Sequence, residues 1–221
     1  MWFNRLFAHD YINSDELAQL LDEIVSPRLD GKGLTRRDKL VWYNDSSNAI
    51  RQGLRYALIK GGRGTFYWGV CLDFIPMQSG SGIKYCRTAQ LFELQLFEWP
   101  EEISNSFFEG KIDKGVADHR GYQPAKRAIT KLFNRLEEEI FQWWSTAHSI
   151  ESLIEIAEAQ IKTGRQYDMH HPNPAYILAF LYARNGQYDK AVYYFDRLSN
   201  AYFDSNDSVR SKLRDKLLQT K

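Results

Sequence analysis

The stretch that decides the fold of the C-terminal half reads Pro174-Ala-Tyr-Ile-Leu-Ala-Phe-Leu-Tyr-Ala-Arg-Asn-Gly-Gln-Tyr-Asp-Lys-Ala-Val-Tyr-Tyr-Phe-Asp-Arg-Leu198. Its Asn185-Gly186 pair is a turn signal between two short segments that carry apolar residues at helical spacing. The small side chains of Ala179 and Ala191 would let the backbones of the two helices approach closely, with larger aromatic residues around them. The stretch therefore predicts a tightly packed helical hairpin.

This hairpin resembles the tetratricopeptide repeat, and such helical hairpins usually bind other proteins. Seven positions match the consensus of that family: Leu178, Ala179, Tyr182, Gly186, Tyr188, Ala191 and Phe195. Three positions depart from it: Ala175 stands where the family favours Trp, Leu198 where it favours Ala, and Phe203 where it favours a closing Pro. The match covers about 34 residues, which is one unit in the family's period. The resemblance implies a helical region that recognises a protein partner.

A single unit of this kind cannot bury its own apolar faces. We expect predicted helices at 149–162 and 209–218 to cover it, which gives a short array rather than an extended solenoid. A binding groove, if the array has one, should be lined by the first helix on its face away from Leu178 and Tyr182. The residues on that face are Asn173, Tyr176, Phe180 and Arg184. The alternative is a plain helical hairpin with no groove.

Further helices are predicted upstream of this hairpin. Apolar residues between Ile129 and Trp144 repeat at i, i+3 and i+4 spacing, and Pro124 suits the first position of that helix. Ser149 is a good N-cap for the helix that follows. The chain should therefore be helical from Pro124 onward, after an irregular connecting segment at 99–122.

The N-terminal half begins with a predicted helix. Ser14 suits its N-cap, and the apolar spacing continues to about Val25, where Pro27 should end the helix. Residues 40–43 are then typical of a strand. One helix ahead of several strands favours a sheet with this helix packed on one face.

Three features predict the remaining strands. The runs 54–60 and 65–75 flank the loop Gly61-Gly-Arg-Gly64, which is a strong hairpin signal, although residues 50–58 also fit a helix. Residues 90–98 alternate between apolar and polar side chains and should form the last long strand. Successive strands with short links favour an antiparallel meander.

The pattern as a whole predicts an α+β fold with two halves. Residues 1–120 should form the antiparallel β-meander with its packed N-terminal helix, and residues 121–221 an all-α, tetratricopeptide-like region. The N-terminal half also resembles bacterial domains of unknown function, some of which lie beside toxin genes. Three segments carry that second resemblance: Lys60-Gly-Gly62, Trp68-Gly-Val-Cys-Leu-Asp-Phe-Ile-Pro76 and Cys86-Arg-Thr88.

Composition limits the classes of partner and the cellular location that we expect. The 221 residues carry a formal net charge of +1. A charge this small favours neither nucleic acid nor an anionic membrane as a general partner. Cys71 and Cys86 are too few for a disulfide scaffold, and we expect them to be buried, reduced thiols. The longest uncharged apolar run, 174–183, is too short to cross a bilayer, so we expect a cytoplasmic protein.

Candidate catalytic groups are sparse. His170-His171 has only Asp168 at ligand spacing, so we expect no metal site and no cofactor. Asp118-His119-Arg120 would place a base beside a carboxylate, but adjacent residues rarely face each other. The Gly61–Gly64 loop lacks the Lys-Ser/Thr ending and the following helix of a phosphate loop, so it is predicted to be a hairpin turn.

Two functional hypotheses follow. The first is a non-enzymatic protein-binding protein, most concretely a bacterial immunity-type or regulatory protein that sequesters a partner such as a toxin. The alternative is a hydrolase or nucleic-acid-modifying enzyme with its site between the sheet and the 99–122 segment. Its polar groups would be Asp73, Asp118, His119 and Arg120, which would have to converge within hydrogen-bonding reach of one point.

Overall fold

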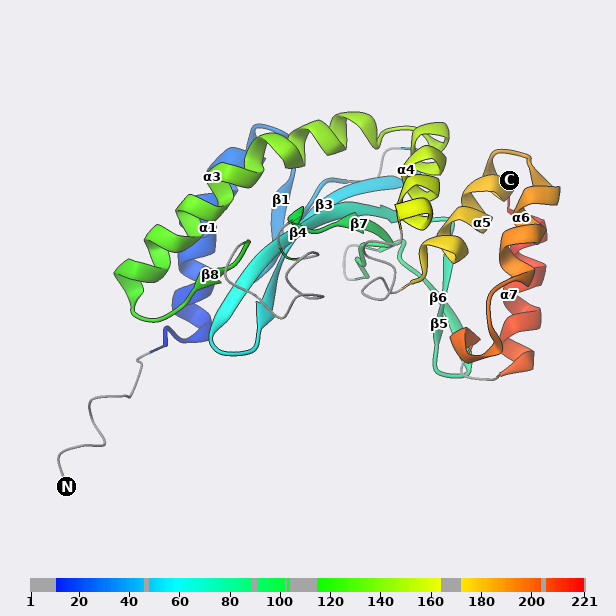
Figure 1. Ribbon diagram of the computed structural model, residues 1–221, viewed down its shortest axis with the longest axis horizontal. Coiled ribbons are helices and arrows are strands. Elements are labelled where there is room, and N and C mark those ends of the chain that lie inside the picture. The colour runs from blue at the N-terminus through cyan, green and yellow to red at the C-terminus, as the bar shows by residue number, and fades with distance from the viewer. Residues whose placement is uncertain are drawn as a thin grey trace, which may run out of the picture. The chain divides into compact units, whose positions relative to one another are not determined.

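The computed structural model describes residues 11–45, 48–88, 91–101, 103, 115–163, 172–203 and 206–220. It contains an antiparallel sheet, an N-terminal helix and a series of helices toward the C-terminus (Figure 1), which confirms the predicted α+β fold class. None of the helices in these residues is both long enough and apolar enough to span a membrane.

The chain divides into two compact units. Unit 1 comprises residues 1–44, 53–68 and 98–142, and unit 2 comprises residues 45–52, 69–97 and 143–221. This division differs from the predicted halves 1–120 and 121–221. It differs because the long strands of the sheet, and the longest helix, each contribute residues to both units.

Within the described residues, the larger sheet has the strand order β1-β2-β3-β4-β7, and β8 pairs with β4. The bounds are β1 Thr35–Asp38, β2 Val41–Tyr43, β3 Ile50–Ile59, β4 Arg63–Leu72, β7 Leu96–Glu98 and β8 Ala117–Asp118. The predicted hairpin around the glycine loop is therefore confirmed as β3 and β4, and the residues that also fitted a helix are strand. A second antiparallel pair, β5 Pro76–Ser79 and β6 Gly82–Tyr85, forms a separate hairpin.

The predicted long strand at 90–98 is wrong, because only β7 at its end is strand. The side chain of Gln95 explains the difference. Gln95 is fully buried, and its Oε1 accepts a hydrogen bond of 2.6 Å from the backbone N–H of Leu72. A glutamine that turns inward and bonds to the neighbouring backbone breaks the alternation that the sequence suggested.

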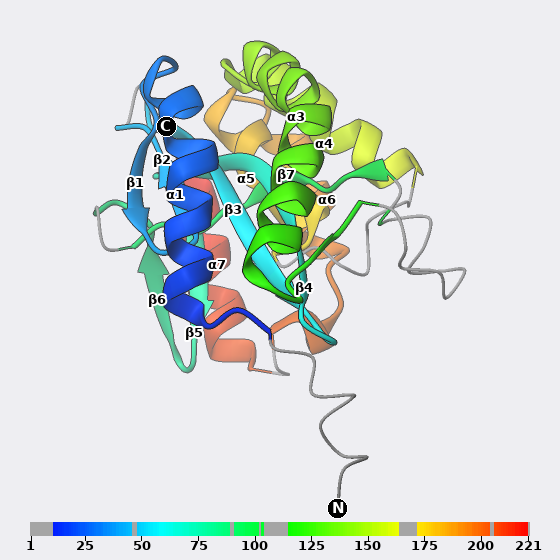
Figure 2. The ribbon, with the colours of Figure 1, turned by 90° about the vertical axis from the view of Figure 1, so that its left-hand side faces the viewer.

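Unit 1 contains helix α1 (Ser14–Asp30) and most of helix α3 (Tyr122–Thr146). Both helices lie against the strands of the larger sheet (Figure 2). The indole N–H of Trp42 in β2 donates to the Ser26 hydroxyl of α1, and the ring of Phe66 in β4 packs against Phe133 of α3 at 5.2 Å. These aromatic side chains therefore form much of the core between the strands and the helices.

Helix α1 departs from its predicted ends at both termini. Its N-cap is Asn13 rather than Ser14, because the Asn13 side chain accepts from the backbone N–H of Glu16 while the Glu16 side chain bonds back to Asn13. This reciprocal capping box satisfies two free backbone N–H groups. The helix also runs through Pro27 to Asp30, since fully buried Leu29 in its last turn packs into the core.

Unit 2 contains α4 (Ile150–Thr163), α5 (Pro174–Arg184), α6 (Tyr188–Asp196), the 3-10 helix η3 (Asn200–Phe203) and α7 (Asp207–Gln219). The predicted cap of α4 is confirmed, since the Ser149 hydroxyl accepts from the Ser152 backbone N–H. The predicted break between α5 and α6 is also confirmed. Gly186 lies there with a φ of 74°, a left-handed conformation that glycine adopts without a steric penalty.

Candidate functional site

The face of α5 that was predicted to line a groove is covered within unit 2. Tyr176 is 1% exposed and Phe180 is fully buried, so the expectation that they form an open surface is wrong. Asn173 caps α5, because its Oδ1 accepts from the Ala175 backbone N–H at 2.8 Å. Arg184 is exposed at the end of the helix. Of the predicted surface residues, Arg184 alone is therefore exposed.

The cover on this face of α5 is the chain's own segment at the start of the β5–β6 hairpin. The hydroxyl of Tyr176 donates a hydrogen bond to the carbonyl oxygen of Pro76. The guanidinium of Arg184 lies over the ring of Phe74, with 5.4 Å between the Arg184 Cζ atom and the ring centroid. A segment of the chain itself therefore covers the face of α5 on which the repeat resemblance placed the partner.

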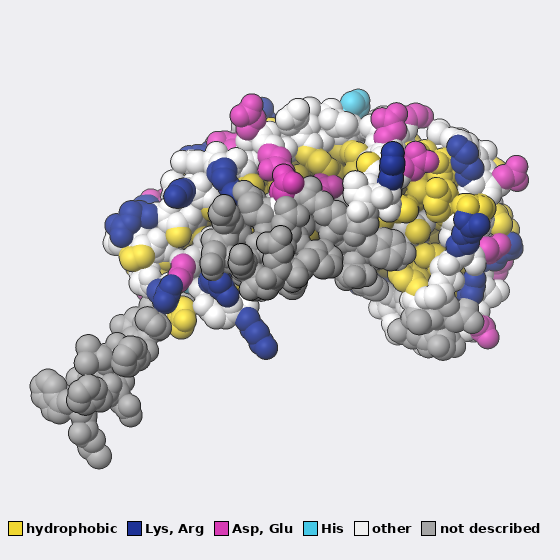
Figure 3. All heavy atoms as spheres, viewed as in Figure 1, with side chains coloured by type: hydrophobic (Ala, Val, Ile, Leu, Met, Phe, Trp, Pro, Cys, Tyr) yellow, Lys and Arg dark blue, Asp and Glu magenta, His cyan; other side chains and the backbone are white. Residues whose placement is uncertain are grey.

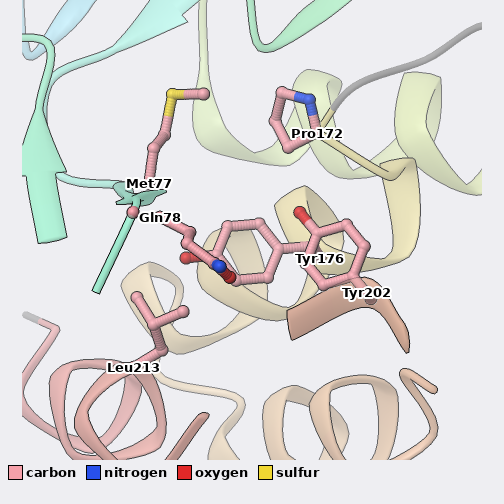
Figure 4. A pocket seen from close by; sticks show the side chains of 7 residues that line it. Met77, Gln78, Pro172, Tyr176, Tyr202 and Leu213 are labelled. Carbon is pink, nitrogen blue, oxygen red and sulfur yellow. The ribbon is translucent and has the colours of Figure 1, made fainter. Parts of the chain in front are cut away.

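A small pocket remains between this hairpin and the helices (Figure 4). Its volume is about 140 Å³, and its lining residues are Met77, Gln78, Gly80, Pro172, Tyr176, Tyr202 and Leu213. The rings of Tyr176 and Tyr202 lie 5.4 Å apart in its wall. The lining mixes apolar side chains with polar ones. The sequence did not indicate this pocket, because its two sides lie about a hundred residues apart in the chain.

The outer side of α6 carries a second feature, which we call the α6 stripe. It consists of Lys190, Tyr193, Tyr194 and Arg197, at positions i, i+3, i+4 and i+7 of one helical face. The opposite face of α6 packs inward through fully buried Ala191 and Phe195. Tyr193 is 49% exposed, so a large aromatic ring is left in solvent on this face.

Contacts within the α6 stripe hold its aromatic and cationic groups in place. The Arg197 guanidinium lies 3.7 Å from the centroid of the Tyr193 ring, and the Tyr193 and Tyr194 rings meet edge to face. Tyr194 also stacks on Tyr182 of α5 with an interplanar angle of 17°, and Lys190 lies over the same Tyr182 ring. Figure 3 shows hydrophobic side chains with Lys and Arg among them over α4, α5 and α6. The sequence contained a signal for this stripe, because its four residues lie at helical spacing on the side of α6 away from the buried Ala191 and Phe195.

The side chains of Asp118 and His119, in the candidate triplet 118–120, do not face each other. Asp118 forms an ion pair with Arg120 at the surface of unit 1, and this pairing lowers the pKa of Asp118. The ring of His119 points the other way, is 4% exposed, and has its Nε2 atom 2.7 Å from the Tyr56 hydroxyl. Burial lowers the pKa of His119, and the charge of Asp118 opposes that shift. The histidine and the carboxylate therefore face different surroundings.

Asp73, the fourth polar group of the enzyme hypothesis, belongs to unit 2. Its carboxylate binds the buried guanidinium of Arg51 at 2.9 Å. Each of the four groups thus has a partner inside its own unit. His170-His171 and Asp168 lie outside the described residues, and within those residues no group of three His, Cys, Asp or Glu side chains could hold a metal ion.

No protein-family model, no curated protein and no solved structure matches this chain. The resemblances to the tetratricopeptide repeat and to bacterial domains beside toxin genes stay predictions from the residues that carry them.

Proposed function

We propose that this chain is a non-enzymatic binding protein that contacts a partner protein through the α6 stripe. The observation that carries the proposal is the ordered set of two tyrosines and two cations on one face of α6. Lys190, Tyr193 and Arg197 are exposed there, and Tyr194 is half-buried beside them. Tyr and Arg are enriched among the residues that dominate interface energetics, and aromatic residues are enriched in interface cores.

The stripe has properties that favour association with another protein. Its tyrosines and Arg197 already contact one another, and Lys190 lies over Tyr182, so fewer rotamers have to be ordered when a partner binds. The ring of Tyr193 would lose its exposed apolar surface to a partner, which is favourable. Arg197 can donate two parallel hydrogen bonds to a carboxylate. The stripe is therefore suited to a surface that combines apolar side chains with carboxylates.

The distance between the two cations of the stripe indicates which kind of partner segment would fit it. Lys190 and Arg197 are seven residues apart, which places them about 10 Å apart along the helix axis. The neighbouring carboxylate of Asp196 is held by Arg214 at 3.1 Å rather than by a cation of the stripe. We expect a partner segment with two acidic groups that flank an apolar centre.

In the most concrete form of this proposal, the chain is an immunity-type or regulatory protein that sequesters its partner in a stoichiometric complex. This form rests on the resemblance of the N-terminal half to domains found beside toxin genes. A toxin encoded next to this chain would be the first partner to test.

The proposal is tested with a photo-crosslinking amino acid placed at Tyr193 in the full chain, expressed in the native host. A control chain carries the same amino acid at Leu58, which is 61% exposed on β3. We expect one dominant cross-linked protein from position 193 that position 58 does not capture. The complex must then form from the two purified proteins. Equal products from both positions, or a captured protein that does not bind after purification, would contradict the proposal.

A further inference from the structure

Two thiols and a buried arginine lie together inside unit 2. Cys71, in β4, is fully buried, and Cys86, directly after β6, is 2% exposed. Both are free cysteines, as the sequence predicted, and both belong to one buried cluster that also contains Met77. The Sγ atom of Cys71 lies 3.7 Å from the carbonyl oxygen of Cys86, and the Sγ atom of Cys86 lies 4.0 Å from the Sδ atom of Met77.

Arg51 brings a positive charge to this pair. Its side chain is 4% exposed, and its Nη2 atom lies 3.3 Å from the Cys71 Sγ atom. The same guanidinium donates to the carbonyl oxygens of Cys86 and Thr88 and binds the carboxylate of Asp73. A cation within contact distance of a thiol favours the thiolate, which is the reactive form of cysteine.

The two cysteines also bracket a single structural element. Cys71 precedes the β5–β6 hairpin and Cys86 follows it, so a bond between them would close a loop around Pro76–Tyr85. This is the hairpin whose first residue, Pro76, accepts the hydrogen bond of Tyr176.

We propose that Cys71 and Cys86 are a redox site, in which a peroxide converts the two thiols into a reversible intramolecular disulfide. A peroxide suits the site because hydrogen peroxide is uncharged and about the size of a water molecule. The buried cluster should exclude a bulky, charged oxidant such as oxidised glutathione.

Arg51 supports ionisation at this site. Its guanidinium contacts Cys71 directly, and its positive charge also acts on Cys86, whereas burial opposes the ionisation of both thiols.

The reaction balances without any other reactant. One of the two thiols releases its proton to solvent, and its thiolate attacks one peroxide oxygen. The O–O bond breaks, and the products are a sulfenic acid and hydroxide. The other thiol gives its proton to that hydroxide, and its sulfur then attacks the sulfenic sulfur. The S–S bond forms, the S–O bond breaks, and the departing hydroxide takes up the proton that the first thiol released, which gives the second water. Two thiols have then been oxidised by two electrons, and one peroxide has been reduced to two waters.

The test uses the full chain under native conditions. After treatment with hydrogen peroxide and alkylation of free thiols, we expect the intact mass to fall by two hydrogens with no alkylation. A peptide that links residues 71 and 86 should appear, and dithiothreitol should reverse the change. Oxidised glutathione should leave the native protein reduced. A bridge that forms only in urea, a bridge between two chains, or oxidation without a bridge would overturn the proposal.

Two single variants whose circular dichroism matches that of the unsubstituted chain serve as controls. In Cys71→Ser and in Cys86→Ser the remaining thiol has no intramolecular partner, so the loss of two hydrogens after peroxide treatment should disappear in both. A loss of two hydrogens that persists in either variant would overturn the assignment of the bridge to these two thiols. The mass measurement on the unsubstituted chain holds even if neither variant folds.

Discussion

The hydroxyl of Tyr176 donates a hydrogen bond to the carbonyl oxygen of Pro76, a residue one hundred positions earlier in the chain. This bond joins α5 to the first residue of the β5–β6 hairpin inside unit 2. The inner face of the helical hairpin is thereby closed by the chain itself. The proposed binding surface is therefore the outer face of α6, which carries the α6 stripe.

Tyr176→Phe should measure the contribution of that bond directly. The variant keeps the ring but leaves the buried Pro76 carbonyl without this donor, which should lower the free energy of unfolding by about 1–2 kcal/mol. Urea denaturation followed by circular dichroism measures the change. The matched control is Tyr193→Phe, in which the ring is exposed, and it should unfold like the unsubstituted chain. Equal stability of the two variants would show that the Tyr176 bond does not stabilise the fold.

Ala191→Trp should disrupt the packing of α5 against α6. Ala191 is fully buried in the face of α6 that packs inward, and overpacking such a site costs about 1–3 kcal/mol. The melting temperature should fall accordingly. Ala159→Trp, on the exposed side of α4, is the control and should leave the melting temperature nearly unchanged. An undisturbed Ala191→Trp variant would mean that the helices do not pack as described.

Arg51→Met should be among the most destabilising single changes in unit 2. The substitution leaves the Asp73 carboxylate without its buried counter-charge, and removal of one member of a buried pair costs about 3 kcal/mol or more. Arg214→Met is the control, because its ion pair with Asp196 is 43–46% exposed. Such surface pairs contribute about 1 kcal/mol or less. Denaturation midpoints that fall equally in the two variants would contradict the buried role of Arg51.

His119 should make the stability of the protein depend on pH. Its pKa in the folded chain lies below the unfolded value of about 6.5, because the ring is buried. Below pH 6.5 the unfolded chain therefore binds a proton that the folded chain does not. Stability should fall as the pH drops from about 7 to about 5, by at most about 1.4 kcal/mol per pH unit.

His119→Gln provides the reference for this pH effect. The variant keeps a polar side chain near Tyr56 but cannot titrate in this range, and all other histidines stay in place. Urea denaturation at pH 7.5, 6 and 5 should therefore give a shallower pH dependence for the variant than for the unsubstituted chain. Parallel curves would show that His119 is not the group that titrates.

Local sequence patterns predicted most of the secondary structure. The Asn185-Gly186 break, the Ser149 cap and the glycine hairpin loop were all correct, because each depends on residues only a few positions apart. The burial of Tyr176 could not be predicted in this way, since the segment that covers it lies one hundred residues earlier in the chain. Likewise, the inward turn of Gln95 depends on a backbone N–H in another strand.

The two features of the candidate site differ in the same way in how far the sequence could predict them. The pocket beside Tyr176 and Tyr202 has walls from two distant segments, so no local pattern indicates it. The α6 stripe, in contrast, follows from a single helix. Once Ala191 and Phe195 are placed in the core, the i, i+3, i+4 and i+7 positions on the other side are fixed by helix geometry. Sequence reasoning missed this stripe because it placed the binding face on α5.

The proposed binding surface is the α6 stripe rather than the inner face of α5. The double variant Tyr193→Ala with Arg197→Ala removes one ring and one cation from the stripe without changing any buried residue. The dissociation constant for the purified partner identified by cross-linking is measured by isothermal titration calorimetry. Leu58→Ala serves as the exposed control, and circular dichroism of both variants should match that of the unsubstituted chain.

We predict a dissociation constant at least about tenfold higher for the double variant, which corresponds to a loss of about 1.4 kcal/mol or more. The Leu58→Ala control should bind like the unsubstituted chain. An unchanged dissociation constant for the folded double variant would contradict the claim that the α6 stripe is the binding surface.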